Sequence, residues 1–178
     1  MTDYDAATQK LLKMVETLQL PPEFSPAYDM VSMVKSFRVA FQNPCLRHCV
    51  LSQKYERRRV EQERFSAGFC GIASYTWNQL FRMDDGTEVW CLKMITSGEY
   101  NIGNHVWLEN VFTGQPLDLT FDQFIDSNGK YVEIPYSKIG HYASSDFAFH
   151  RAYKFANYLG IDLERIVFEN SLRALGRR

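Results

Sequence analysis

Three residues of the types that form a nucleophilic catalytic site occur in order along the chain: Cys70, His105 and Asp118. A thiol attacks as its thiolate, which a helix N-terminus and a neighbouring imidazole both stabilise. Cys70 lies between Gly68 and Gly71, which let backbone and substrate approach closely. His105 can act as a base, and Asp118 can orient its imidazole. The sequence therefore predicts a Cys–His–Asp site that transfers acyl groups.

The segments around these residues are predicted to hold them on a helix and two strands. Apolar residues at helical spacing follow Cys70 and predict a helix that begins there. Alternating residues predict strands at 105–111 and 116–120, after an earlier strand at 87–95. Thr113-Gly114 predicts the turn between the two later strands. The base and the acid are thus expected on adjacent strands.

The remaining chain is predicted to be helical. Apolar periodicity predicts helices at 5–18, from Ser25-Pro26 to 41, at 44–64, at 145–159 and at 162–175. Helices followed by a small antiparallel sheet and then more helices indicate an α+β fold. The 178 residues fit a single domain, 1–178, with a helical N-terminal layer, 1–64, a catalytic core, 65–124, and a C-terminal helical part, 125–178.

Three sequence motifs, GFCGIAS, NHVWLENV and GQPLDLTFDQF, resemble the core of the transglutaminase-like group of papain-like cysteine enzymes. The resemblance covers residues 65–124 and implies a papain-like fold. It also implies that Cys70 is the nucleophile, His105 the base and Asp118 the orienting acid. The residues Trp107, Glu109 and Thr120 match further positions of these motifs.

The activity implied by the resemblance is that of a thiol-dependent hydrolase or acyl transferase acting on an amide bond. Among such enzymes we expect a cysteine protease or a glutamine deamidase, because the helical N-terminal layer favours a protein or peptide substrate. No cofactor is expected. The alternative is a protein of a different functional class: a non-catalytic adaptor on the same fold, which would bind its partner through the N-terminal helices.

The predicted turn leaves the identity of the acid open. A turn at Thr113-Gly114 pairs Asp118 with Glu109 and His105 with Asp122. Four residues of strand span ~13 Å, which is too far for a hydrogen bond from His105 to Asp118. Asp118 is retained because of the resemblance, and Asp122 is the substitute acid. The oxyanion side chain is also open, with weak candidates at Gln62, Ser66 and Asn104.

Composition limits the other function classes. The net charge of −1 argues against recruitment of nucleic acid or an anionic membrane. Apolar runs fall short of the ~20 residues of a membrane span, and the polar N-terminus is unlike a secretory signal. Four cysteines in such a chain are expected to be reduced, in the cytoplasm or in a protein secreted without a signal peptide. Cys45 and Cys49 lack a second ligand pair, so no metal site is expected. The oligomeric state is left open.

Overall fold

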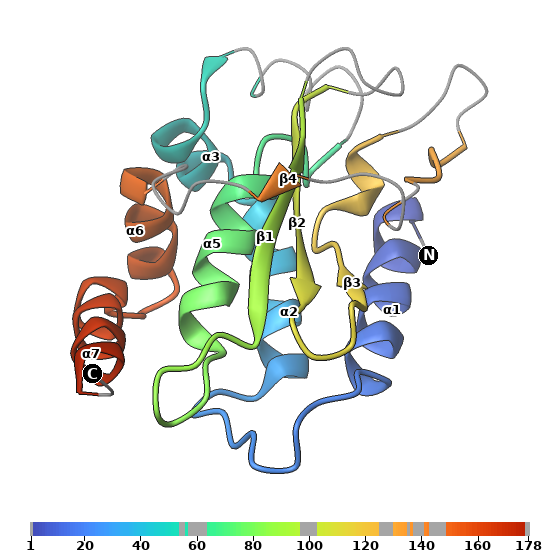
Figure 1. The fold of residues 1–178 in the computed structure, drawn as a ribbon. Helices are drawn as coiled ribbons and strands as arrows, with labels where there is room; N and C mark the ends of the chain where they lie inside the picture. The colour runs from blue at the N-terminus through green and yellow to red at the C-terminus, as the bar shows by residue number, and fades with distance from the viewer. Residues whose placement is uncertain are drawn as a thin grey trace.

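The computed structural model describes residues 2–53, 56, 64–96, 103–124, 130–134, 136, 141–142 and 149–176. They form an α+β fold (Figure 1). The helices are α1 (Asp3–Glu16), α2 (Met30–Gln42), α3 (Pro44–Val50), α5 (Cys70–Leu80), α6 (Phe149–Tyr158) and α7 (Leu163–Leu175), with a 3₁₀ turn η2 (Phe121–Gln123). The strands are β1 (Trp90–Ile95), β2 (His105–Asn110), β3 (Pro116–Leu117) and β4 (His141–Tyr142).

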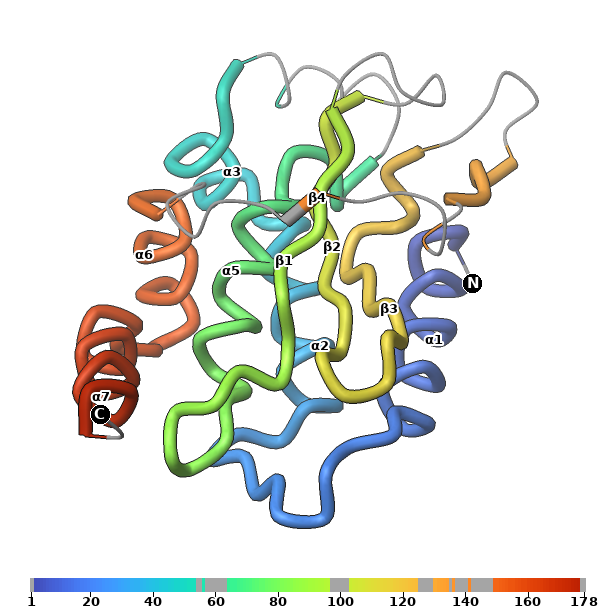
Figure 2. The backbone as a smooth tube through the Cα atoms, in the orientation of Figure 1, coloured from blue at the N-terminus to red at the C-terminus, as the bar shows by residue number. Residues whose placement is uncertain are grey.

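The strands form one antiparallel sheet in the order β3-β2-β1-β4. Helix α5 packs against β1 and β2, while α6 and α7 pack against α5. Figure 2 shows α1 on the β3 side of the molecule and α7 on the opposite side. The sheet and α5 therefore lie between the two terminal helical parts.

Helix α5 is the centre of the core, because every residue from Gly71 to Leu80 is buried. An aromatic cluster joins it to helices from both ends of the chain. Phe37 of α2 contacts Trp77 of α5 and Phe155 of α6, with ring centroids 6.3 and 4.9 Å apart. Phe69, directly before α5, stacks on Phe41 at 4.5 Å. This packing fixes the N-terminal end of α5, where Cys70 lies.

Two predicted helix boundaries in the N-terminal layer are wrong. Helix α2 begins at Met30 instead of at Ser25-Pro26, because the Asp29 side chain caps it by accepting from the backbone N–H of Ser32. Helix α3 ends at Val50, since Leu51 is extended. The later part of the predicted 44–64 helix lies mostly outside the described residues.

The predicted register of the β2–β3 hairpin is also wrong. Glu109 pairs with Pro116, whereas the prediction paired it with Asp118. The connection is a longer turn over residues 111–114, in which Gly114 donates its N–H to the Asn110 carbonyl oxygen at 2.8 Å. The Asn110 side chain also accepts from the N–H of Phe112. These bonds favour the wider turn over a two-residue one.

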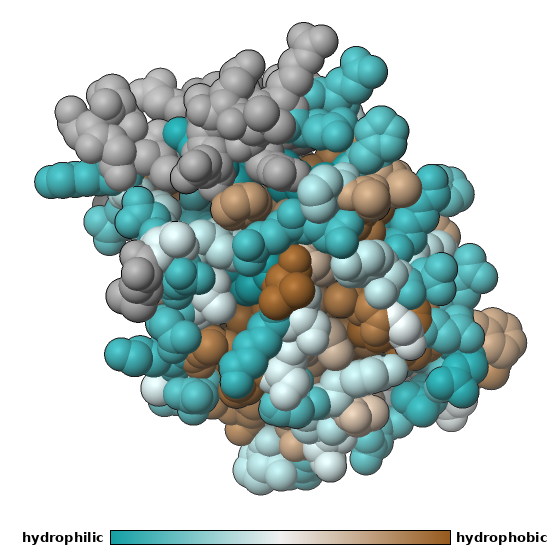
Figure 3. All heavy atoms as spheres, turned by 180° about the vertical axis from the view of Figure 1, so that it is seen from behind, coloured by the Kyte–Doolittle hydropathy of each residue, from teal (hydrophilic) through white to brown (hydrophobic). Residues whose placement is uncertain are grey.

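Among the described residues, no helix is long and apolar enough to cross a membrane. On the face seen from behind, apolar side chains form separate patches among hydrophilic ones (Figure 3). Larger exposed apolar side chains include Phe168, Leu172 and Leu175 of α7.

Candidate active site

Cys70 is the first residue of α5, as the sequence predicts. The chain reaches it through a turn at residues 65–68, where Gly68 adopts a φ of +86° that strongly favours glycine. The thiol of Cys70 is free and half-buried. The first position of a helix lies at the partial positive end of the helix dipole. The local sequence therefore places the Cys70 side chain at the N-terminal end of α5.

His105 is the first residue of β2, and its side chain is fully buried. Its Nε2 lies 2.5 Å from Oδ2 of Asp118, which is itself only 1 % exposed. The structure thus brings the predicted base and the predicted acid together. A carboxylate at this position fixes the orientation of the imidazole.

The observed register explains how His105 reaches Asp118. If the pairing of Leu108 with Leu117 continued, Asp118 would lie opposite Trp107, two residues from His105 on the same face of the strand. Such diagonal neighbours on paired strands are ~7–8 Å apart, which a histidine and an aspartate side chain can bridge. The shift of the turn by one position resolves the conflict seen in the sequence.

The carboxylate of Asp118 accepts hydrogen bonds at both oxygens. Oδ1 accepts from the backbone N–H of Thr120 at 2.9 Å and from its hydroxyl at 3.3 Å. Oδ2, which bonds His105, also accepts from the Tyr136 hydroxyl at 2.8 Å. A buried carboxylate with this many hydrogen-bond partners is held in one position.

A further side chain contacts His105 from the 3₁₀ turn. Nε2 of Gln123 lies 2.9 Å from Nδ1 of His105. The same amide nitrogen donates to the backbone oxygen of Thr120 at 3.2 Å and to its hydroxyl at 3.0 Å. Both ring nitrogens of His105 therefore have partners.

The surroundings of His105 act on its pKa in opposite directions. Burial lowers the pKa, whereas the charge and hydrogen bond of Asp118, followed by a hydrogen bond with Cys70 and the charge of Cys70, raise it. The net result is an increase from 6.5 to about 10. The thiol of Cys70 is thus close enough to interact with the imidazole, which is the arrangement that proton transfer requires.

Aromatic rings enclose the imidazole. Phe124 meets it edge-on, with ring centroids 4.9 Å apart, and Trp107 stacks near it at 6.0 Å. Tyr136 contacts Trp107 at 5.4 Å. These rings keep water from the bond between His105 and Asp118, which strengthens the electrostatic interaction within the pair.

Asp122, the substitute acid of the sequence analysis, has a different partner. Its carboxylate forms a two-pronged ion pair with Arg38, with N–O distances of 2.8 and 2.7 Å, and both residues are buried. Arg38 comes from α2, so the pair joins the helical layer to η2. Asp118, and not Asp122, is therefore the carboxylate that contacts His105.

Of the three oxyanion candidates, Ser66 and Asn104 lie among the described residues. Ser66 is fully buried, and its hydroxyl has no hydrogen-bond partner among the described residues. Asn104 is exposed, and Gln62 lies outside the described residues. Sequence reasoning missed Gln123 and Tyr136 as partners of the site. The only available signal for Gln123 was its place in the LTFDQF segment, beside the matched Thr120.

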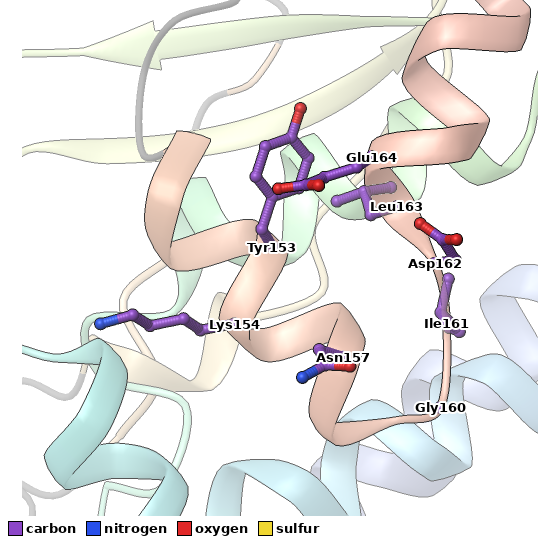
Figure 4. Close-up of a pocket in the computed structure, with 8 residues that line it drawn as sticks. All are labelled: Tyr153, Lys154, Asn157, Gly160, Ile161, Asp162, Leu163 and Glu164. Atoms are coloured by element: carbon purple, nitrogen blue, oxygen red, sulfur yellow. The ribbon is translucent and has the colours of Figure 1, made fainter.

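The other cysteines lie apart from this constellation. Cys45 and Cys49 are exposed free thiols, and burial raises the pKa of the Cys91 thiol in β1. No group of three or more His, Cys, Asp or Glu side chains within the described part of the chain could hold a metal ion. A groove of about 540 Å³ lies between α6 and the start of α7, where Tyr153 and Glu164 point toward each other (Figure 4). This groove contains none of the three predicted catalytic residues.

Comparison with protein-family models, with curated proteins and with solved structures found no match to this chain.

Proposed function

We propose that this chain is a thiol-dependent hydrolase or acyl transferase that acts on amide bonds through a Cys70–His105–Asp118 triad. One observation carries the proposal. A buried imidazole, held by a carboxylate at 2.5 Å, also interacts with a thiol at a helix N-terminus. Nucleophile, base and orienting acid are then within reach of one another, which is the geometric requirement for nucleophilic catalysis.

The same arrangement supports a papain-like fold with a transglutaminase-like core. In such a core the nucleophile begins a helix, and the base and the acid come from neighbouring strands. Here Cys70 begins α5, His105 begins β2, and Asp118 directly follows β3. Helix α5 packs against β2, which keeps the thiol and the imidazole on one rigid unit.

The reaction proposed begins with transfer of the Cys70 proton to His105. The thiolate attacks the amide carbonyl carbon, the carbonyl π electrons move to oxygen, and a tetrahedral intermediate forms. When it collapses, the C–N bond breaks, His105 protonates the leaving amine, and an acyl-enzyme remains. Water then completes proteolysis or deamidation, whereas an amine would complete acyl transfer. We propose protease or glutamine deamidase activity on a protein or peptide.

Alkylation of the four cysteines tests the site without knowledge of the substrate. At pH 6, iodoacetamide should modify Cys70 faster than Cys45, Cys49 and Cys91, as measured by peptide mass spectrometry. Cys45 and Cys49 are exposed free thiols within the same molecule and serve as controls for accessibility. His105→Ala should slow the reaction of Cys70 at pH 6 and leave the other three rates unchanged.

Uniform alkylation of the exposed thiols together with slow modification of Cys70 in both proteins would contradict the enzyme proposal and favour the adaptor. The second measurement is a screen of peptides and protein glutamines for new N-termini and for released ammonia. Cys70→Ser should keep the fold and lose any activity found, because the serine hydroxyl is far less acidic than a thiol.

A further inference from the structure

Gln123 contacts the ring nitrogen of His105 that would accept the proton of Cys70 in the proposed reaction. Nε2 of His105 is occupied by Asp118, so Nδ1 is the nitrogen left to accept the proton of Cys70. Nδ1 also faces Nε2 of Gln123 at 2.9 Å. A ring nitrogen has one lone pair or one proton in the ring plane, so Cys70 and Gln123 compete for the same position.

The orientation of the Gln123 amide is fixed by Thr120. The carbonyl oxygen of Thr120, 3.2 Å away, can only accept a hydrogen bond, so the group that faces it must be the amide nitrogen. That nitrogen also faces Nδ1 of His105 at 2.9 Å, and it can donate a hydrogen bond there only when Nδ1 is unprotonated. The proton of the neutral imidazole is then on Nε2, where it is donated to Asp118.

The Gln123 amide and the groups Asp118 and Cys70 favour different protonation states of His105. Although burial alone lowers the pKa of His105, Asp118 and Cys70 raise it and favour the doubly protonated ring. The amide of Gln123 favours the opposite form, with Nδ1 unprotonated.

Other charged and titratable groups nearby do not favour the unprotonated ring. Tyr136 donates to Asp118, and Arg64 donates to the backbone oxygen of Gln123 at 3.2 Å. The neighbouring ion pair of Arg38 with Asp122 is balanced in charge. Among these groups, the Gln123 amide is the one whose hydrogen bond favours the neutral ring.

We propose that Gln123 gates the triad: at rest its amide holds Nδ1 of His105, and it releases that nitrogen when the carbonyl oxygen of an amide substrate takes over the amide N–H. The inference rests on the proposed function of Cys70 and His105. On release, the Cys70 proton moves to Nδ1, the S–C bond forms, and the carbonyl π pair moves to oxygen. The oxygen then carries the charge that the Gln123 N–H stabilises.

The gate is tested by iodoacetamide alkylation of Cys70 in the full chain at pH 6 and at pH 10. Gln123→Met keeps the length of the side chain and removes the donor. At pH 6 its Cys70 should react about five- to tenfold faster than in the wild type, which corresponds to ~1.0–1.4 kcal/mol. At pH 10, where His105 is losing its proton, the two proteins should react at nearly equal rates.

Gln79→Met is the matched control. Gln79 and Gln123 are buried to nearly the same extent, 6 % and 7 % exposed, but Gln79 lies near the other end of α5 from Cys70. Its replacement should leave the alkylation rate of Cys70 unchanged at both pH values. Adding His105→Ala to Gln123→Met should abolish the gain at pH 6, because the gate acts only through the imidazole.

The outcomes separate the gate from the triad. If His105→Ala slows Cys70 in the wild type but Gln123→Met has no effect, the triad stands and the gate is wrong. If Gln123→Met raises the rate equally at pH 6 and pH 10, the amide merely blocks access, and the gate is again wrong. If neither variant alters the rate, both proposals fail. Should Gln123→Met not fold, Gln123→Asn withdraws the same amide by one methylene and is judged by the same criteria.

Discussion

Two buried carboxylates four positions apart have contrasting partners. Asp118 bonds the titratable imidazole of His105, while Asp122 bonds the guanidinium of Arg38. An imidazole can gain and lose a proton near neutral pH, whereas a guanidinium stays charged at every accessible pH. The first pair is therefore suited to proton transfer, and the second is suited to joining α2 and η2.

The two pairs also differ in how they are built. Asp118 receives its donors from residues near the sheet, including Thr120 and Tyr136. The Arg38 side of the other pair is held by α1, because Arg38 also donates to the Thr8 hydroxyl at 3.0 Å. Changes to the first pair should thus alter reactivity, and changes to the second should alter stability.

The largest effect is expected for Asp118→Asn. The neutral amide no longer stabilises the imidazolium and favours the wrong tautomer of His105, so turnover should fall by ~10³–10⁴-fold. The measurement is the rate with any amide substrate found in the screen, together with alkylation of Cys70 at pH 6. Unchanged rates in a folded Asp118→Asn protein would show that this carboxylate has no part in activating the thiol.

Loss of one member of the other pair should chiefly affect folding. Asp122→Leu leaves the guanidinium of Arg38 buried without its counterion, so the free energy of unfolding should fall by ~3–5 kcal/mol. Urea denaturation measures the loss.

The double variant Arg38→Met with Asp122→Leu is the control for this prediction. Because it removes both charges, it should regain most of the lost stability. It should also retain reactive Cys70. A double variant no more stable than Asp122→Leu would mean that the shape of the pair matters more than its charge.

The sequence predicted the contact between His105 and Asp118 and the position of Cys70 at a helix start, but it did not predict what surrounds them. Cys70, His105 and Asp118 were identifiable because each belongs to a short motif whose residues are adjacent in sequence. The register was wrong because the choice between a two-residue turn and a wider one depended on backbone hydrogen bonds to Asn110. Such bonds follow from local geometry that residue spacing does not specify.

The partners of Asp118 and Asp122 were hidden for a different reason. Arg38 precedes Asp122 by 84 positions, and the two meet only because the tertiary fold brings α2 close to η2. Gln123 and Tyr136 reach the site from a 3₁₀ turn and a loop, where no periodic pattern marks a buried position. Contacts of this kind depend on tertiary packing, which sequence patterns do not record.

The pH dependence of stability should also separate the two pairs. Because the pKa of His105 is raised from 6.5 to about 10, its stabilising contribution is complete below pH 6.5 and is lost as the pH rises through about 10. The ordinary pKa values of arginine and aspartate side chains both lie outside this range. Wild type should therefore lose more stability than His105→Gln between pH 6 and pH 10 in urea denaturation.

The gate proposed for Gln123 sharpens this pH test. Since its amide opposes protonation of His105, Gln123→Met should show a larger loss of stability than wild type over the same range.

The comparison of wild type with His105→Gln has its own contradicting outcome. Parallel curves for these two proteins would show that His105 has the same proton affinity in the folded and unfolded chain.

The smallest effect is expected for Tyr136→Phe, which removes one of the donors to Asp118. The hydroxyl bonds Oδ2, the same oxygen that holds His105, so its loss should loosen the imidazole without removing the carboxylate. One hydrogen bond to a charged group contributes ~1.5–3 kcal/mol, and part of this is recovered by the remaining donors from Thr120. Alkylation of Cys70 at pH 6 should therefore slow by ~3–10-fold. Tyr131→Phe is the matched control, because the Tyr131 hydroxyl donates at 3.1 Å to the backbone oxygen of Asp3, away from the triad, and its loss should not change the rate. Equal effects of the two substitutions would mean that Tyr136 supports the fold in general and not the orientation of Asp118.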